Sequence, residues 1–153
     1  MKYYLAYGSN LNTEQMTWRC PGAKPVGTAV IKGYELLFKG SKTGSYLTIE
    51  KKPDGVVPVA VWAVNGEHEK ALDRYEGYPN FYYKANADIE MTTLKGDKKR
   101  ITAFVYIMHE DRPLGIPSGR YMQTCLEGYR AFGFDEKYLF NAYRKSKGDS
   151  DEN

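Results

Sequence analysis

The sequence predicts an α+β fold in which about six strands precede the last two helices. Continuous or alternating apolar segments, typical of strands, fill most of the first two thirds of the chain. Segments in which apolar residues recur three and four positions apart, as in amphipathic helices, come last. Strands and helices do not alternate regularly, which argues against a parallel doubly wound sheet. At 153 residues, 42% of them hydrophobic, the chain has the size and composition of one globular domain.

The first strand is predicted at Tyr3–Tyr7, an apolar and aromatic segment typical of a strand buried on both faces. The turn residues Gly8–Asn10 end it. Asn12 or Thr13 is then placed to cap a short helix that ends before Pro21.

Three further strands are predicted before residue 64. Gly27–Lys39 is extended, with a kink at Gly33, and Tyr46–Lys51 alternates as a half-buried strand does. The turn signal Pro53–Gly55 separates it from Val59–Val64, whose continuous apolar side chains indicate a central strand.

A helix is predicted to open at Asn65 and to run through Tyr75, and Gly77 is suited to end it. Two strands follow, Tyr82–Thr93 and Arg100–Met108, joined by a Gly-Asp turn. With these two strands the predicted total comes to about six.

The C-terminal part predicts two helices. Ser118 is placed to cap the first and Gly133 to end it, and Asp135 starts the second. The apolar face of the first helix consists of Tyr121, Met122, Cys125, Leu126, Tyr129 and Phe132. We therefore expect one domain over residues 1–144 and a polar, frayed tail over residues 145–153.

Charge and composition exclude several classes of function. Lys and Arg number 22 against 19 Asp and Glu, and the densest basic cluster, Lys98–Arg100, is typical of a solvated turn. The longest apolar run, Val59–Val64, is far shorter than the roughly 20 residues of a membrane span, and no secretory signal is visible. Cys20 and Cys125 lack metal-ligand spacing. We expect a cytoplasmic protein that binds neither nucleic acid nor membranes and contains no structural metal.

A candidate anion site lies at Gly8–Asn10. A buried strand that leads into small residues and a helix start leaves backbone N–H groups pointing one way, and such groups bind anions or oxyanions. Gly8 lets the backbone approach a ligand closely. An ordinary strand-to-helix turn is the alternative interpretation.

Glu76 is the candidate general base. It follows Leu72 by four residues, which places it on the apolar side of the helix, near the end where the dipole disfavours negative charge. Both effects raise the pKa of a carboxyl group, as a base working near neutral pH requires. In the alternative, the helix end is frayed and Glu76 lies in water.

The remaining candidates are weaker. Tyr121, one turn after the Pro-Ser helix start, packs in the core or offers its hydroxyl to a ligand. His68 is expected to be exposed in a charged stretch, and His109 lies at a strand end, so a Ser-His-Asp triad has no support. Cys125 is expected to be buried, whereas Cys20 could be exposed.

These signals occur together in one family. Tyr3–Leu11 (YYLAYGSNL), Leu72–Gly77 (LDRYEG) and Pro117–Tyr143 resemble the γ-glutamylcyclotransferase family, also called AIG2-like, in order and spacing along nearly the whole chain to about Tyr143. The resemblance implies a small mixed β-barrel of about six strands flanked by helices.

The resemblance also implies an activity and a site. The family converts a γ-glutamyl amide to 5-oxoproline and a free amine, without a cofactor. Glu76 matches the acid/base glutamate, and Tyr121 matches a tyrosine that contacts the substrate. The substrate-cradling loop matches Tyr4, Leu5, Ala6, Tyr7, Gly8, Ser9 and Asn10.

Three points stay open at this stage. A non-enzymatic module that binds a small acidic metabolite through Gly8–Asn10 would share the fold, because a fold does not fix function. The leaving amine (an amino acid, a peptide such as glutathione, a polyamine or a biosynthetic intermediate) depends on loops 40–45 and 111–116. The oligomeric state is also open, with a homodimer as one option.

Overall fold

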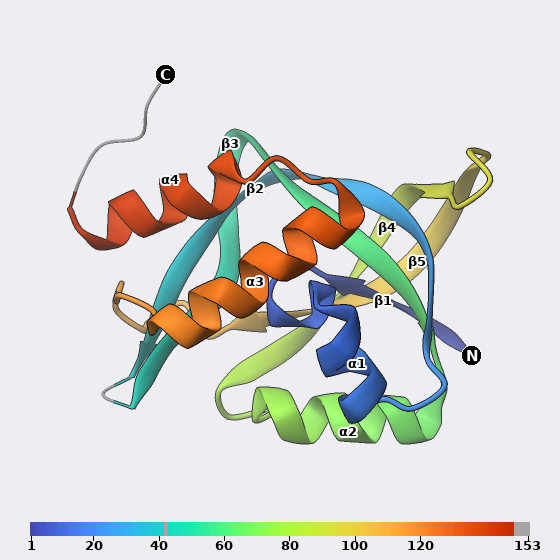
Figure 1. Cartoon of the computed structure of the whole chain (residues 1–153), viewed down its shortest axis with the longest axis horizontal. Helices are drawn as coiled ribbons and strands as arrows, with labels where there is room; N and C mark the ends of the chain where they lie inside the picture. The colour runs from blue at the N-terminus through green and yellow to red at the C-terminus, as the bar shows by residue number, and fades with distance from the viewer. Residues whose placement is uncertain (42, 149–153) are drawn as a thin grey trace.

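The computed structural model describes residues 1–41 and 43–148 and shows a closed β-barrel flanked by helices (Figure 1). The elements in chain order are β1 (Lys2–Ala6), the 3₁₀ turn η1 (Ser9–Leu11), α1 (Thr13–Arg19), β2 (Lys24–Ser41), β3 (Gly44–Val64), α2 (Gly66–Glu76), β4 (Tyr82–Thr93), β5 (Lys98–Met108), α3 (Gly119–Phe132) and α4 (Lys137–Ser146).

The barrel is mixed, as predicted. Its strands follow the order β1-β3-β2-β4-β5, and β5 returns to β1 in a parallel pair, Tyr3 with Ala103 and Tyr4 with Phe104. The other neighbouring pairs are antiparallel. The first strand thus lies between β3 and β5, buried on both faces, and its C-terminal end opens directly into η1.

The strand count of about six is wrong, because the described residues form five. The segment Pro53–Gly55 does not reverse the chain but lies inside β3, with Asp54 at φ 64°. Lys32 pairs with Val56 and Tyr34 with Lys51, so residues 52–55 bulge opposite Gly33. The expected kink at Gly33, which has φ 81°, is this irregularity. Pairing with β2 on both sides of the bulge keeps β3 one strand.

The ends of α1, α2 and α3 follow the predicted local signals, whereas α4 begins at Lys137 rather than at Asp135, whose carboxylate accepts from the N–H of Lys137 at 2.9 Å. The Asn12 side chain caps α1 by accepting from the N–H of Gln15 at 3.1 Å. The Ser118 hydroxyl caps α3 in the same way. Gly77 and Gly133 end α2 and α3 in the left-handed conformation, where glycine carries no steric penalty.

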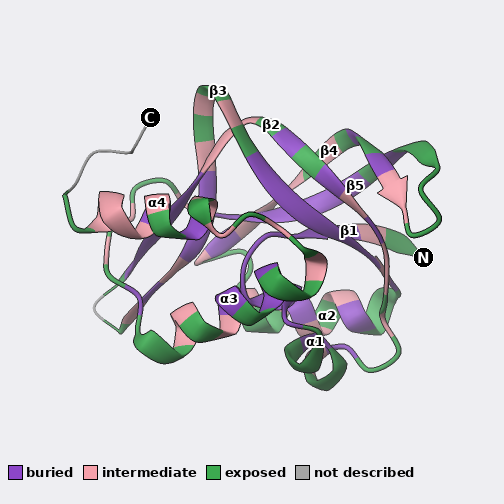
Figure 2. Ribbon diagram, turned by 45° about the horizontal axis from the view of Figure 1, so that its top comes forward, coloured by how far each residue is buried: buried purple, intermediate pink, exposed green. Residues whose placement is uncertain are grey.

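The core fills the barrel and the seam between the barrel and its helices (Figure 2). Two expectations about solvent exposure, for His68 and Cys20, are wrong. His68 is buried rather than exposed, because it completes a capping box with Asn65, and its Nε2 lies 2.6 Å from the carbonyl oxygen of Pro21. Cys20 is fully buried and points its Sγ at the His68 carbonyl oxygen. Cys125 is buried, as expected.

Helix α3 holds the segment that follows β1. A Cβ atom on Gly128 would lie 2.6 Å from Cβ of Leu11 and 2.8 Å from the backbone nitrogen of Asn12, so glycine is needed for this close approach. The Tyr129 hydroxyl donates to the Tyr7 carbonyl oxygen at 3.4 Å. The turn at η1 is thereby fixed from outside by a helix distant in sequence.

The C-terminal helix α4 packs on β2 and ends at Ser146, two residues into the expected tail. Residues 149–153 of that tail lie outside the described residues. Across residues 1–41 and 43–148, no helix has both the length and the apolarity that crossing a membrane requires.

Candidate active site

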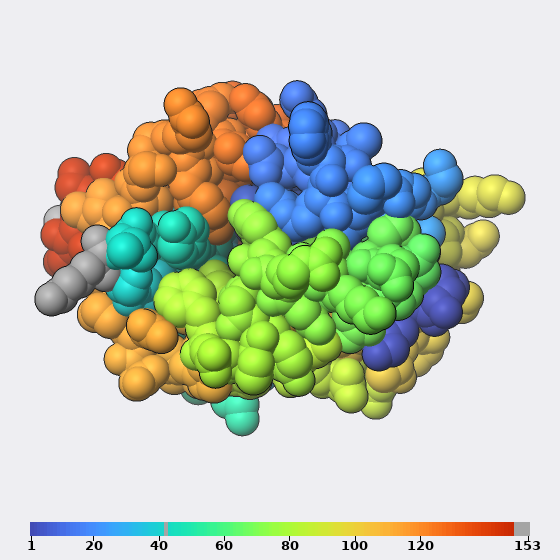
Figure 3. Space-filling view, turned by 90° about the horizontal axis from the view of Figure 1, so that it is seen from below, coloured from blue at the N-terminus to red at the C-terminus, as the bar shows by residue number. Residues whose placement is uncertain are grey.

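A pocket of about 280 Å³ opens where η1, the C-terminal end of α2, the start of α3 and the strands of the barrel meet. The surface is hollowed between these elements when the molecule is viewed from the side of α2 (Figure 3). The lining residues are Tyr4, Tyr7, Gly8, Ser9, Asn10, Tyr46, Leu47, Arg74, Tyr75, Glu76, Gly77, Phe81, Tyr82, Tyr106 and Tyr121.

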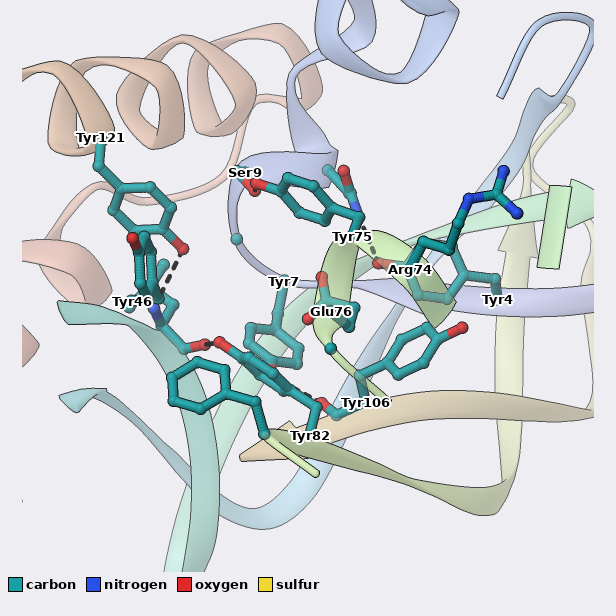
Figure 4. Close-up of a pocket in the computed structure, with 15 residues that line it drawn as sticks. Tyr4, Tyr7, Ser9, Tyr46, Arg74, Tyr75, Glu76, Tyr82, Tyr106 and Tyr121 are labelled. Carbon is teal, nitrogen blue, oxygen red and sulfur yellow. Dashed lines mark hydrogen bonds between the residues drawn. The ribbon is translucent and has the colours of Figure 1, made fainter. Parts of the chain in front are cut away.

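Glu76 is held in this pocket by the end of its helix. It is the last residue of α2, and the N–H of Gly77 turns back to the carbonyl oxygens of Arg74 and Asp73. Leu72, one turn earlier, is completely buried, so this side of the helix faces the barrel. The Glu76 carboxyl group consequently points into the pocket, beside Tyr7 (Figure 4).

The environment of Glu76 favours its neutral form. Burial raises the pKa of the carboxyl group from its ordinary value to about 8, although the positive charge of Arg19 lowers it somewhat. The predicted direction of the shift is therefore confirmed. A carboxyl group that titrates near neutral pH is suited to accept and return protons.

Gly8 and the η1 residues Ser9 and Asn10 line the same pocket. The carbonyl oxygens of Gly8 and Ser9 accept from Leu11 and Asn12 at 3.0 Å, which closes the turn. The N–H groups of Gly8, Ser9 and Asn10 take part in none of the hydrogen bonds found among the described residues. These N–H groups are thus available to an anionic group of a ligand.

The polar side chains of this turn are already engaged. The Ser9 hydroxyl lies 2.8 Å from the Tyr75 hydroxyl, and the Asn10 amide donates to the Tyr4 hydroxyl at 2.9 Å. The hydrogen-bond partner of the Ser9 hydroxyl is a phenol rather than a histidine, so Ser9 is not paired with the kind of base that activates a nucleophilic serine. The turn therefore contributes backbone amide groups and a hydroxyl group to the lining of the pocket.

Tyr121 closes the pocket from α3. Its hydroxyl oxygen accepts from the N–H of Leu47 at 3.0 Å, and its ring stands edge-on to Tyr46, with centroids 5.2 Å apart. The hydroxyl proton is not used in that bond and can be donated to a ligand. The two interpretations of Tyr121 thus combine, because it both packs and lines the pocket.

The structure brings most of the expected site residues together. Glu76 and Tyr121 line the pocket, and so do Tyr4, Tyr7 and the turn at Gly8–Asn10. Leu5 and Ala6 do not: both are buried inside the barrel wall, where they pair with Val61 and Ala60 of β3. His109 also lies elsewhere, with its Nε2 2.7 Å from the Pro79 carbonyl oxygen.

Several lining residues were not foreseen from the sequence. Tyr82 donates to the carbonyl oxygen of Leu47 at 2.7 Å, and Tyr106 donates to a carboxylate oxygen of Asp73 at 2.6 Å. The remaining unforeseen residues are Tyr46, Leu47, Arg74, Tyr75, Gly77 and Phe81. Arg74, Tyr75 and Gly77 lie within two residues of Glu76, which is a usable signal. Phe81 comes from the segment before β4, and the others join the site only through the register of the barrel strands.

Comparisons with known proteins point to one family. A sequence model of the family described as gamma-glutamyl cyclotransferase, AIG2-like, matches residues 4–123. The gamma-glutamylcyclotransferase of Bos taurus is 33% identical over 144 residues, which cover 88% of this chain and 73% of the bovine chain. The Homo sapiens gamma-glutamylcyclotransferase is 32% identical over the same shares of the two chains.

Solved structures give the same result. A structure described as a gamma-glutamyl cyclotransferase has a TM-score of 0.75 and 28% identity, and the match covers 99% of this chain and 89% of the other. A glutathione-specific gamma-glutamyl cyclotransferase from yeast shares the fold, with a TM-score of 0.61 at 12% identity, over 97% of this chain and 96% of the yeast chain. The chain therefore belongs to the gamma-glutamyl cyclotransferase, AIG2-like family.

Proposed function

We propose that this protein is a γ-glutamylcyclotransferase in which Glu76 moves the protons and the turn at Gly8–Asn10 binds the negative charge. The substrate is a γ-glutamyl amide, and the products are 5-oxoproline and a free amine. One observation carries the proposal: a carboxyl group of raised pKa lies in the same pocket as three backbone N–H groups that no other hydrogen bond among the described residues uses.

The reaction requires the protein to position the substrate and to transfer protons. The α-nitrogen of the substrate attacks its own γ-carbonyl carbon, so nucleophile and electrophile are already tethered. Folding the substrate into a ring-like conformation brings the two within reach. A small pocket with aromatic walls, such as the one around Glu76, restricts an extended γ-glutamyl chain to compact conformations.

The proton transfers run through Glu76. Its carboxylate accepts a proton from the α-ammonium group, and the new C–N bond forms as the carbonyl oxygen becomes negative. Glu76 then returns the proton to the leaving nitrogen, the old C–N bond breaks and the carbonyl re-forms. A second proton, lost by the attacking nitrogen as the ring closes, ends on the amine, which departs as an ammonium ion. The amides of Gly8–Asn10 stabilise the oxyanion or hold the α-carboxylate.

Turnover of a simple substrate tests the function. Incubation with γ-glutamyl-alanine is expected to release 5-oxoproline and alanine in equal amounts, measured by liquid chromatography. A thermal shift caused by glutamate-like ligands, without any product, would instead identify a binding module on the same fold. A panel of γ-glutamyl amides with different amines would then define the leaving group, including whether glutathione is used.

The pH dependence follows from the pKa of Glu76. The base must be ionised, so kcat/KM is expected to rise with pH and to reach half its plateau near pH 8, the value for the free enzyme. The midpoint for kcat should lie lower, because the bound α-ammonium group favours the carboxylate. Initial rates from pH 5.5 to 9.5 in buffers of constant ionic strength give both midpoints. A flat kcat/KM over this range would contradict the assignment of the base.

A further inference from the structure

Arg19 lies behind the pocket wall and contacts two of its parts. It is the last residue of α1 and is half-buried. Its guanidinium group lies 3.4 Å from the centroid of the Tyr75 ring, on the helix that ends in Glu76. The same group donates to Asn10 Oδ1 in the η1 turn and to Gln15 Oε1 at 2.9 Å. Arg19 itself does not line the pocket.

The contacts of Arg19 continue into the pocket along two branches. The Asn10 amide nitrogen donates to the Tyr4 hydroxyl at 2.9 Å, and the Tyr75 hydroxyl lies 2.8 Å from the Ser9 hydroxyl. One cation thus braces the amide-bearing turn and the last turn of α2 at the same time. The two segments come from distant parts of the sequence, and Arg19 adds a second connection between them beside the direct contact of Ser9 with Tyr75.

Arginine is the side chain that suits this position. A planar guanidinium group stacks on an aromatic ring and donates in its own plane to two acceptors. The ammonium group of lysine is a point charge that makes no such stack. The position also matters electrostatically, since Arg19 is the cation whose charge lowers the pKa of Glu76.

The other titratable groups around Glu76 are mainly phenols. They come from every element packed against it: Tyr4, Tyr7, Tyr46, Tyr82, Tyr106 and Tyr121. Burial raises the pKa of Tyr4, Tyr7 and Tyr82 well above the ordinary value, so they stay neutral over the working pH range. On α2 itself, Tyr75 adds another phenol, and the Arg74 guanidinium extends away from Glu76 (Figure 4).

We propose that Arg19 is a positioning residue of the active site, which holds the Gly8–Asn10 turn against the end of α2 and supplies positive charge to Glu76 from outside the pocket. The inference rests on the proposed function of Glu76 and adds to it a residue that does not touch the substrate. It gives α1 a role in the reaction, because Arg19 is the last residue of that helix.

The test compares the pH profiles of Arg19→Met and Arg19→Lys with γ-glutamyl-alanine as substrate. Arg19→Met is expected to raise the midpoint of kcat/KM by about one pH unit and to lower the plateau kcat by about tenfold, because charge and bracing are both lost. Arg19→Lys keeps the charge, so its midpoint stays near the wild-type value while kcat still falls. Arg130→Met is the control, since it removes an exposed arginine paired with Glu136 and leaves both quantities unchanged.

A wild-type midpoint in Arg19→Met would overturn the proposal, even if Tm and kcat fell, because that pattern describes a structural role only. If Arg19→Met fails to fold, Arg19→Gln keeps a donor for Asn10 and removes the charge, and its midpoint decides in the same way. Full activity in Glu76→Gln would refute the proposed function itself. An inactive Glu76→Gln together with an unmoved midpoint in Arg19→Met or Arg19→Gln, which both remove the charge, would refute only the role of Arg19.

Discussion

Glu76→Gln is expected to lower kcat by about 10²–10⁴-fold, because the amide cannot carry a proton between the two nitrogen atoms of the substrate. Substrate binding should persist, since glutamine keeps the size and most of the polarity of the side chain. The measurement is steady-state release of 5-oxoproline, combined with calorimetric binding of γ-glutamyl-alanine. Near-native turnover would remove Glu76 from the mechanism.

A matched control lies on the same helix. Glu67 is an exposed residue in the first turn of α2, so Glu67→Gln removes a negative charge without touching the pocket. Wild-type activity is expected for this control. A comparable loss in both variants would show that the charge of α2, rather than the carboxyl group in the pocket, governs turnover.

Glu76→Gln should also change the free energy of unfolding, and the sign of this change follows from the pKa of Glu76. The native pKa of Glu76 is about 8, above the value of the unfolded chain, so its contribution to stability is fully present below pH 4.5 and is lost as pH rises through 8. Glutamine does not titrate. The stability of Glu76→Gln relative to wild type should therefore grow from pH 4.5 to 8 and then level off. We expect a gain of about 1–3 kcal/mol, since the side chain keeps some contact with water.

Gly8→Ala is expected to lower kcat/KM by about 10²-fold, comparable to losing one oxyanion donor. A Cβ atom at this position would lie 3.3 Å from Cβ of Leu47 and 3.4 Å from the Tyr121 hydroxyl oxygen. The added methyl group would occupy the floor of the pocket and push the amide-bearing turn away from Tyr121. Kinetics and a ligand-induced thermal shift measure the two consequences.

Gly66→Ala provides the comparison for this prediction. Gly66 begins α2, and a Cβ atom there would meet nothing within 4 Å. We expect wild-type kinetics and an equal or slightly higher Tm, because alanine is the better helix former. If Gly8→Ala also behaved like wild type, close approach of the substrate to this turn would be excluded.

Local signals in the sequence were enough to select the candidate base. Glu76 follows a buried leucine by one helical turn and precedes a glycine that ends the helix, and both relations survive in the fold. The turn after β1 was found for the same reason, since its small residues interrupt an apolar strand. Such features depend on neighbours within about four residues, so they can be derived from the chain alone.

Other features depended on distant neighbours and were missed or wrong. The exposure of His68 was mispredicted in part because one of its partners, the Pro21 carbonyl oxygen, comes from another part of the chain, although the capping box with Asn65 is local. The turn expected at Pro53–Gly55 became a bulge because β2 pairs with β3 on both sides of it. A role for Arg19 was not predicted, since nothing local to α1 shows that its guanidinium group lies over the ring of Tyr75.

By itself, the sequence determined the class of fold, the ends of the first three helices, the acid at position 76 and the family that these imply. Only the tertiary structure decided that five strands close the barrel, that aromatic residues of β3, β4 and β5 wall the pocket, and that Arg19 bridges its two sides. The physical reason is the range of the forces involved. Capping and helical periodicity act between near neighbours, whereas strand register and the burial that raises the pKa of Glu76 arise only when distant segments pack together.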